Sequence, residues 1–169
     1  KGSVRLIEPE ITTSDIFTEQ LLKASGIDYT ILFHPPFMDL LSFHYGLKPF
    51  EKGIHVPVIH HGQVAAATKD ELAEAHAVIL SSTGHENKSY SLGGSEAISF
   101  ADMASTLSQI KGKPVAFTAI PAKEHTANRL AEGLPLGVAE FVTNWIQAID
   151  QGEFSEQTGD LERLLGRKT

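Results

Sequence analysis

The chain has 169 residues, of which 41% are hydrophobic, so it is long enough to bury one core and falls in the size range of a single domain. Its 14 Lys and Arg residues against 21 Asp and Glu residues give a formal charge of −7, with no local basic patch, which argues against nucleic-acid and membrane partners. The lack of cysteine excludes disulfides and thiolate catalysis and, with no apolar run long enough to span a membrane, fits a cytoplasmic protein.

The N-terminal residues predict strands that alternate with a helix. Residues 4–7 form a β-branched run that suits a buried strand, and Ser14 or Asp15 can cap a helix that Gly26 ends. Residues 29–33 read as the next strand, and their consecutive apolar side chains predict that both faces are covered, as in a parallel sheet. This β-α-β succession implies a right-handed crossover.

The next segment predicts a short helix and a turn. Residues 37–43 are expected to form a short apolar helix or lid, and Gly46 with Pro49 argues against a regular helix beyond it. Two apolar runs, 54–58 and 64–67, flank the sequence His-His-Gly-Gln at 60–63. We expect a hairpin-like turn there.

The second half of the chain carries stronger helix signals. Thr68 is expected to cap a helix over 70–80, and Ser99 another, with Asp102 completing an approximate capping box. The inward side of that second helix is expected to carry Met103, Leu107 and Ile110. The remaining predicted elements are strands at 88–92 and 115–120, helices opening at Pro121 and covering 135–149, and a short terminal helix around 161–165.

Candidate functional residues gather after the strand at 29–33. In open α/β sheets, ligands bind outside the carboxyl ends of strands, so His34 is the candidate catalytic residue, able to donate a hydrogen bond or exchange a proton. The alternative is that His34 packs beside Pro35. Expected substrate contacts are Tyr29, Pro36, Phe37, Met38 and Leu41, for which core packing is the competing interpretation.

Histidines are concentrated in the same part of the chain, which raises the alternative of a metal site. They are His34, His44, His55, His60 and His61. Neighbouring residues on a strand point to opposite faces, so His60 and His61 would share one ion only in a turn. We therefore expect no metal site.

The run Thr-Glu-Gln-Leu-Leu-Lys-Ala-Ser-Gly-Ile-Asp-Tyr-Thr-Ile-Leu at 18–32 resembles a segment of NmrA-like atypical short-chain dehydrogenases/reductases, which include NAD(P)H-dependent quinone reductases. Residues 70–75 followed by 84–92 resemble the linker helix and next strand of that family, and 98–102 the start of its next helix. The similarity covers most of 4–150 and concerns only the C-terminal part of such proteins. The family's first strands and its G-x-G-x-x-G fingerprint have no counterpart in this sequence.

The resemblance implies an α/β, Rossmann-like NAD(P)-binding fold that lacks its N-terminal strands and glycine fingerprint. It implies one domain over 1–169, with the end of the Rossmann-like sheet in 1–45 and the substrate-side part in 46–169. It further implies NADP or NAD as cofactor, contacted by Phe33, His34 and Pro35, and reduction of a small apolar acceptor such as a quinone. A homo-oligomer or a second chain is expected to complete the fold.

Two departures from the family pattern support a rival interpretation. The family commonly has Arg-Pro-Gly after this strand, whereas this chain has Phe33-His34-Pro35. The Tyr-x-x-x-Lys pair of typical short-chain dehydrogenases is also missing, because Tyr45 and Lys48 are one residue too close. The rival is a non-catalytic NAD(P)-sensing or ligand-binding regulatory protein.

Overall fold

A parallel strand pair forms the part of the fold that carries the expected site. In the computed structural model, which describes residues 9–46 and 48–169, β1 (Thr30–Phe33) pairs with β4 (Lys88–Ser91), with Thr30 opposite Lys88 and Phe33 opposite Ser91. Both strands were expected, and the parallel pairing of β1 agrees with the parallel sheet expected for it. The expected cover on both faces of β1 is wrong, because Phe33 is 43% exposed and the other three residues are only half-buried.

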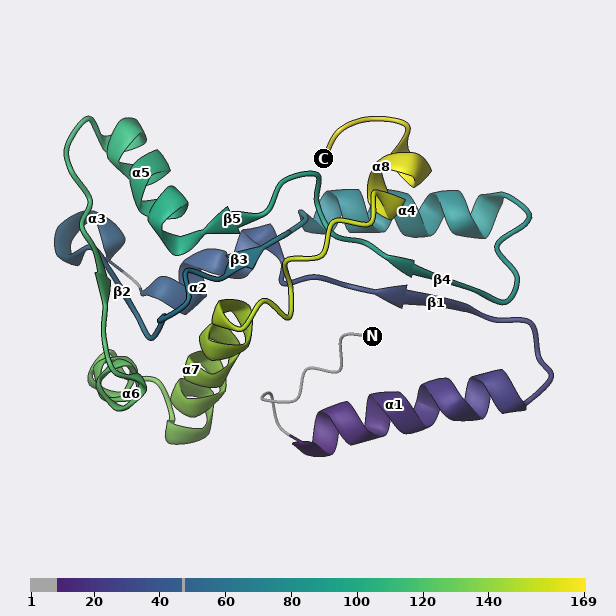
Figure 1. The fold of residues 1–169 in the computed structure, drawn as a ribbon, viewed down its shortest axis with the longest axis horizontal. Helices are drawn as coiled ribbons and strands as arrows, with labels where there is room; N and C mark the ends of the chain where they lie inside the picture. Colours follow the sequence, from purple (N-terminus) through teal and green to yellow (C-terminus); the bar gives the residue numbers. More distant parts are fainter. Residues whose placement is uncertain (1–8, 47) are drawn as a thin grey trace.

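The helix before β1 starts earlier than its sequence suggests. Helix α1 runs over Pro9–Ala24, so Ser14 and Asp15 lie inside it rather than at its cap. Proline suits the first turn of a helix because its fixed φ is already helical and its missing N–H has no intrahelical partner there. The strand expected at 4–7, and with it the crossover, lies outside the described residues. Helix α1 lies at the edge of the molecule in Figure 1.

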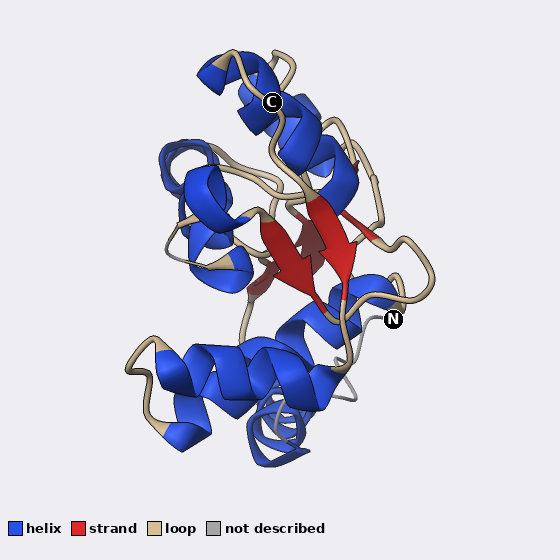
Figure 2. Ribbon diagram, turned by 90° about the vertical axis from the view of Figure 1, so that its left-hand side faces the viewer, coloured by secondary structure: helices blue, strands red, loops and turns tan. Residues whose placement is uncertain are grey.

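Two further pairs of short strands lie among the helices, as Figure 2 shows. Strand β2 (Ile54–Val56) pairs in parallel with β6 (Phe117–Ala119), and β3 (Gln63–Val64) pairs antiparallel with β5 (Ile98–Ser99). Strands β2 and β3 therefore do not pair with each other, and the predicted hairpin at 60–63 is wrong.

A buried carboxylate explains why that turn is not a hairpin. Asp150, 6% exposed at the end of helix α7 (Leu136–Asp150), accepts backbone N–H bonds from Ile59 at 2.6 Å, His60 at 2.9 Å and Gly62 at 3.1 Å. The turn packs so closely that a Cβ on Gly62 would lie 2.1 Å from the Ile149 carbonyl oxygen. The segment is thus fixed to the end of α7, and the two strands that it joins pair with different strands.

The predicted caps at Thr68 and Ser99 and the predicted capping box at Ser99 are confirmed, and the structure adds a second capping box at Thr68. Thr68 caps helix α4 (Lys69–Ser81) by accepting from the Glu71 N–H, and the Glu71 carboxylate accepts from the Thr68 N–H. Ser99 and Asp102 do the same for helix α5 (Phe100–Lys111). The expected inward position of Ile110 is wrong, since it is 73% exposed and α5 buries only residues of its first turns.

The remaining helices have six residues or fewer, except α6, which has ten. These helices are η1 (Met38–Leu40), α2 (Leu41–Tyr45), α3 (Pro49–Lys52), α6 (Ala122–Ala131) and α8 (Asp160–Leu165). The buried side chains form two clusters. The larger cluster joins α2, β2, α5 and α7 around Ile54, Phe100 and Ile146. The smaller one lies between α4, β4 and α8 around Leu72 and Leu92. No helix of the described residues is long and apolar enough to cross a membrane.

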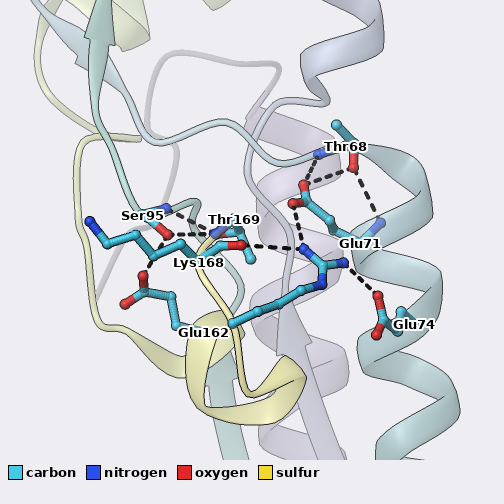
Figure 3. Close-up of polar contacts among 8 residues, drawn as sticks. Thr68, Glu71, Glu74, Ser95, Glu162, Lys168 and Thr169 are labelled. Atoms are coloured by element: carbon cyan, nitrogen blue, oxygen red, sulfur yellow. Dashed lines mark hydrogen bonds and ion pairs between the residues drawn. The ribbon is translucent and has the colours of Figure 1, made fainter.

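The last residues of the chain are held against α4 by polar contacts (Figure 3). Arg167 donates to Glu74 at 2.6 Å and to Glu71 at 3.3 Å, so it contacts the same carboxylate that closes the α4 capping box. Ser95 donates to Glu162 at 2.7 Å, and its hydroxyl lies 3.0 Å from that of Thr169. These contacts connect the C-terminal residues to both α4 and the loop after β4.

One fully buried histidine is held neutral between α6 and α7. His125 Nδ1 lies 2.8 Å from the Thr143 hydroxyl, which itself donates to the Ala139 carbonyl, so Nδ1 carries the hydrogen and donates. The other ring nitrogen, Nε2, is buried without a hydrogen-bond partner. Burial, reinforced by the positive charge of Arg129, lowers the pKa of His125 to about 4.

We predict that Asp150→Asn lowers the free energy of unfolding by about 2 kcal/mol. Both carboxylate oxygens of Asp150 accept from backbone N–H groups, whereas an asparagine would turn an NH₂ group towards at least one of these donors and leave it without an acceptor. Urea denaturation at neutral pH measures the change. Glu140→Gln removes an exposed carboxylate from the same helix and should leave the unfolding midpoint unchanged. Equal midpoints for Asp150→Asn and the parent would contradict the role given to Asp150.

We also predict that His125 makes stability depend on pH. Between pH 6.5, the ordinary pKa of a histidine, and the folded-state pKa of about 4, the unfolded imidazole binds a proton and the folded one does not. The free energy of unfolding therefore decreases by about 3 kcal/mol as the pH is lowered through this window, and is unaffected above it. Urea midpoints for His125→Gln should lose this contribution, whereas the exposed His60→Gln should keep it. The same pH slope in His125→Gln and the parent would be inconsistent with a neutral buried imidazole.

Candidate functional site

The loop that follows β1 is fixed at both ends. The Phe33 carbonyl accepts from the Leu92 N–H at 2.9 Å, and the Met38 N–H donates to the Ala67 carbonyl at 2.9 Å. The Asp39 carboxylate then accepts from the first backbone N–H of α4, on Lys69, at 2.8 Å. The residues between these bonds include two prolines, so the backbone that presents His34 has little conformational freedom.

His34 forms a pair with a second histidine, on α4. The Nε2 atoms of His34 and His76 are 2.9 Å apart, and the ring centroids 4.9 Å. At this distance one ring donates and the other accepts, so the pair shares one proton between the two Nε2 atoms. Partial burial and the neighbouring His76 lower the pKa of His34, which favours the neutral form of its imidazole.

Phe37 lies against the same pair. Its ring centroid is 6.2 Å from that of His34, and the Lys69 ammonium lies 5.7 Å above its ring. The ring also packs against the smaller buried cluster. The site therefore combines a proton-holding pair, an aromatic ring and a cation, which suits a ligand with a flat apolar part and a polar group.

The expected site residues occupy different environments. Phe33 and Met38 are 43% and 40% exposed, and Pro35 is half-buried. All three lie within four residues of His34 in the sequence. Pro36 is buried, and Leu41 is 4% exposed in the larger buried cluster. Tyr29 precedes β1 and thus lies at the end of the strand opposite to His34. The structure brings His34 and Phe37 together, and places Tyr29 and Leu41 elsewhere.

Sequence reasoning missed His76. Its signal was its position four residues after Leu72 and three before Ile79, which puts an ionisable side chain next to the apolar stripe of α4. The histidines grouped in the sequence do not meet as a set. His44 is buried against Trp145, and His55 contacts the Lys52 carbonyl through Nε2 at 2.8 Å. Within the described ranges, no three His, Asp or Glu side chains come close enough to hold a metal ion.

Comparisons with known proteins agree with the expected fold. No family model matches the sequence. Quinone oxidoreductase 2 of Escherichia coli K12 is 30% identical over 156 residues, which cover 91% of this chain and 54% of that protein. The solved structure of an NADPH-dependent quinone oxidoreductase from Escherichia coli superposes with a TM-score of 0.87 at 25% identity, covering 98% of this chain and 60% of that one.

A Citrobacter triphenylmethane reductase complexed with NADP(H) superposes with a TM-score of 0.84 at 27% identity, over 98% of this chain and 58% of that one. These likenesses confirm the predicted α/β, Rossmann-like fold. The chain spans about half the length of the curated relatives it matches, in agreement with the expected match to a C-terminal part.

Proposed function

We propose that this chain belongs to the NmrA-like atypical short-chain dehydrogenases/reductases and is the substrate-side part of an NAD(P)H-dependent oxidoreductase, as its likeness to quinone oxidoreductases supports. The proposed acceptor is a small apolar molecule such as a quinone. In this proposal, residues 1–45 contribute the end of the Rossmann-like sheet and 46–169 the substrate side. The observation that carries it is the fixed loop after β1, which holds the His34 and His76 pair beside the ring of Phe37.

The residues present fit one end of the cofactor. Phe33 and Pro35 offer an apolar surface at the carboxyl end of β1, where a nicotinamide ring would lie. The sequence contains no G-x-G-x-x-G turn, so the pyrophosphate would be held outside these 169 residues. When bound, NAD(P)H supplies a hydride. His34 would hold a proton at Nε2 beside the acceptor, while Phe33 and Phe37 exclude water from it.

A non-catalytic sensor is the second candidate function, and one contact favours it. His34 Nε2 is already engaged with His76 Nε2, so it faces a ligand only after this hydrogen bond opens. In a sensor, ligand binding would replace the contact between the two imidazoles, and no turnover would follow.

The free edge and faces of β1 support the proposal that another part completes the fold. Among the described strands, β1 pairs only with β4, and Phe33 is 43% exposed. Helix α1 exposes Phe17 at 58% and Leu21 at 54%. Apolar surface and unpaired strand edges of this kind are normally covered. We propose that the Rossmann half, in the same protein or on a second chain, covers them, and that the assembly is a cytoplasmic homo-oligomer.

We predict that His34→Ala lowers turnover of a quinone with NADPH by at least about a hundredfold in the full-length protein, the usual contribution of a positioned proton donor. The fold should persist, because the side chain lies in an exposed loop. Steady-state kinetics and thermal unfolding measure the two effects. His60→Ala, which removes another exposed imidazole, is the matched control. Unchanged turnover in His34→Ala with a sharply lower melting temperature would identify His34 as a packing residue.

We predict that residues 1–169 alone bind NADPH weakly, because the glycine-rich turn that binds pyrophosphate is not in this sequence. Calorimetric titration of this segment and of the full-length protein tests the prediction. Low-micromolar binding by the segment alone would show that these residues build a phosphate site of their own.

A further inference from the structure

A cleft of about 400 Å³ lies away from the loop after β1, between α3, β2 and α6. These elements occupy the side of the molecule opposite to β4 and α8 in Figure 1. The cleft is lined by Tyr45, Gly46, Lys48, Lys52, His55, Arg129 and Glu132, among others. None of these residues belongs to the site described above.

Arg129 forms the base of this cleft. Its side chain is buried, with the residue 5% exposed, and Nη2 donates to Glu132 Oε1 at 3.0 Å. The pair is not self-contained, because Arg129 Nε and Glu132 Oε2 are both buried without a hydrogen-bond partner. The guanidinium is thus held by a single carboxylate bond, and part of its donor capacity is unused.

The backbone is shaped to admit this guanidinium. A Cβ at Gly46 would lie 2.7 Å from Arg129 Nη2 and 2.9 Å from Nη1. Gly46 has a φ of +112°, which side chains with a Cβ rarely adopt. The planar group therefore lies directly against a bare backbone, at a position where any other residue would displace it.

Charge in the cleft is opposite in sign to that of the chain. Lys48 just before α3 and Lys52 at its end line the cleft and, with Arg129, outweigh the one lining carboxylate by two charges, whereas the whole chain carries −7. Lys48 Nζ lies 3.6 Å from Glu51, but both side chains are more than half exposed, so this contact is weak. Within the described part of the chain, Lys52 has no ion-pair partner.

We propose that this cleft binds the phosphate group of a small phosphate monoester. A phosphate carries nearly two negative charges at neutral pH, matching the excess in the cleft, and a planar guanidinium is suited to its oxygens. Arg129 would hold the phosphate, and Lys52 would contact it from the rim. The site goes beyond the proposed oxidoreductase function and does not depend on it.

The test is a titration of the full-length protein with inorganic phosphate at constant ionic strength, with NADPH present at saturation to fill its own phosphate sites. Backbone amide NMR signals of Gly46, Gly53 and Asn128 report on the cleft. We expect saturable shifts at these positions. Lys52→Gln should weaken binding about fivefold, as for loss of one exposed charge, and Arg129→Lys at least tenfold.

Lys88→Gln also removes one exposed charge, on β4, and this variant should bind phosphate like the parent. Lys52→Gln keeps the test valid even if the variant at the buried Arg129 fails to fold. Shifts that do not saturate, or equal affinity in folded Lys52→Gln and the parent, would overturn the proposal. Acetate binding as tightly as phosphate would overturn the choice of phosphate as the ligand group.

Discussion

Three backbone N–H groups donate to the buried Asp150 carboxylate, and these hydrogen bonds hold the segment between β2 and β3 against the end of α7. A carboxylate at the C-terminal end of a helix is unfavourable for the helix dipole, so it needs donors from elsewhere in the chain. Residues 59–62 supply them. This fixes the chain between β2 and β3 to the end of α7, while β2 pairs with β6 and β3 with β5.

Both candidate sites depend on this arrangement. After β3 the chain reaches Ala67, whose carbonyl holds Met38 and thereby the loop that presents His34. Strand β2 is preceded by α3 and Gly53, which border the Arg129 cleft. A loop held by backbone bonds at both ends keeps a proton-holding side chain in one place, which favours chemistry that requires orientation rather than a nucleophile.

The apolar surface on α1 and β1 agrees with the partial coverage of the relatives. The two buried clusters lie away from α1, so its exposed aromatic and aliphatic side chains gain little from the packing of the described residues. The same edge would lie next to the cofactor in the proposed enzyme. Completion of the fold and completion of the site are therefore one event in this interpretation, because the residues that close the sheet also bring the pyrophosphate site.

The sequence by itself determined the local elements. The helix caps at Thr68 and Ser99, the apolar periodicity of α7 and the β1 strand all depend on residues within a few positions of one another, and such signals are readable without a fold. The proposed location of the main site was also readable, since His34 directly follows a strand. The start of α1 could not be read from the sequence. Ser14 and Asp15 are residue types that commonly cap helices, but the helix already begins at Pro9.

Only the tertiary structure decided the pairings between distant segments. The turn at 60–63 reads as a hairpin until Asp150, some ninety residues later, is known to bind it. His76 becomes part of the site only when α4 packs against the loop after β1, and Arg129 lines a cleft only when α6 lies against Gly46. Each of these contacts joins groups far apart in the chain, whose proximity depends on the packing of the whole core rather than on any local pattern.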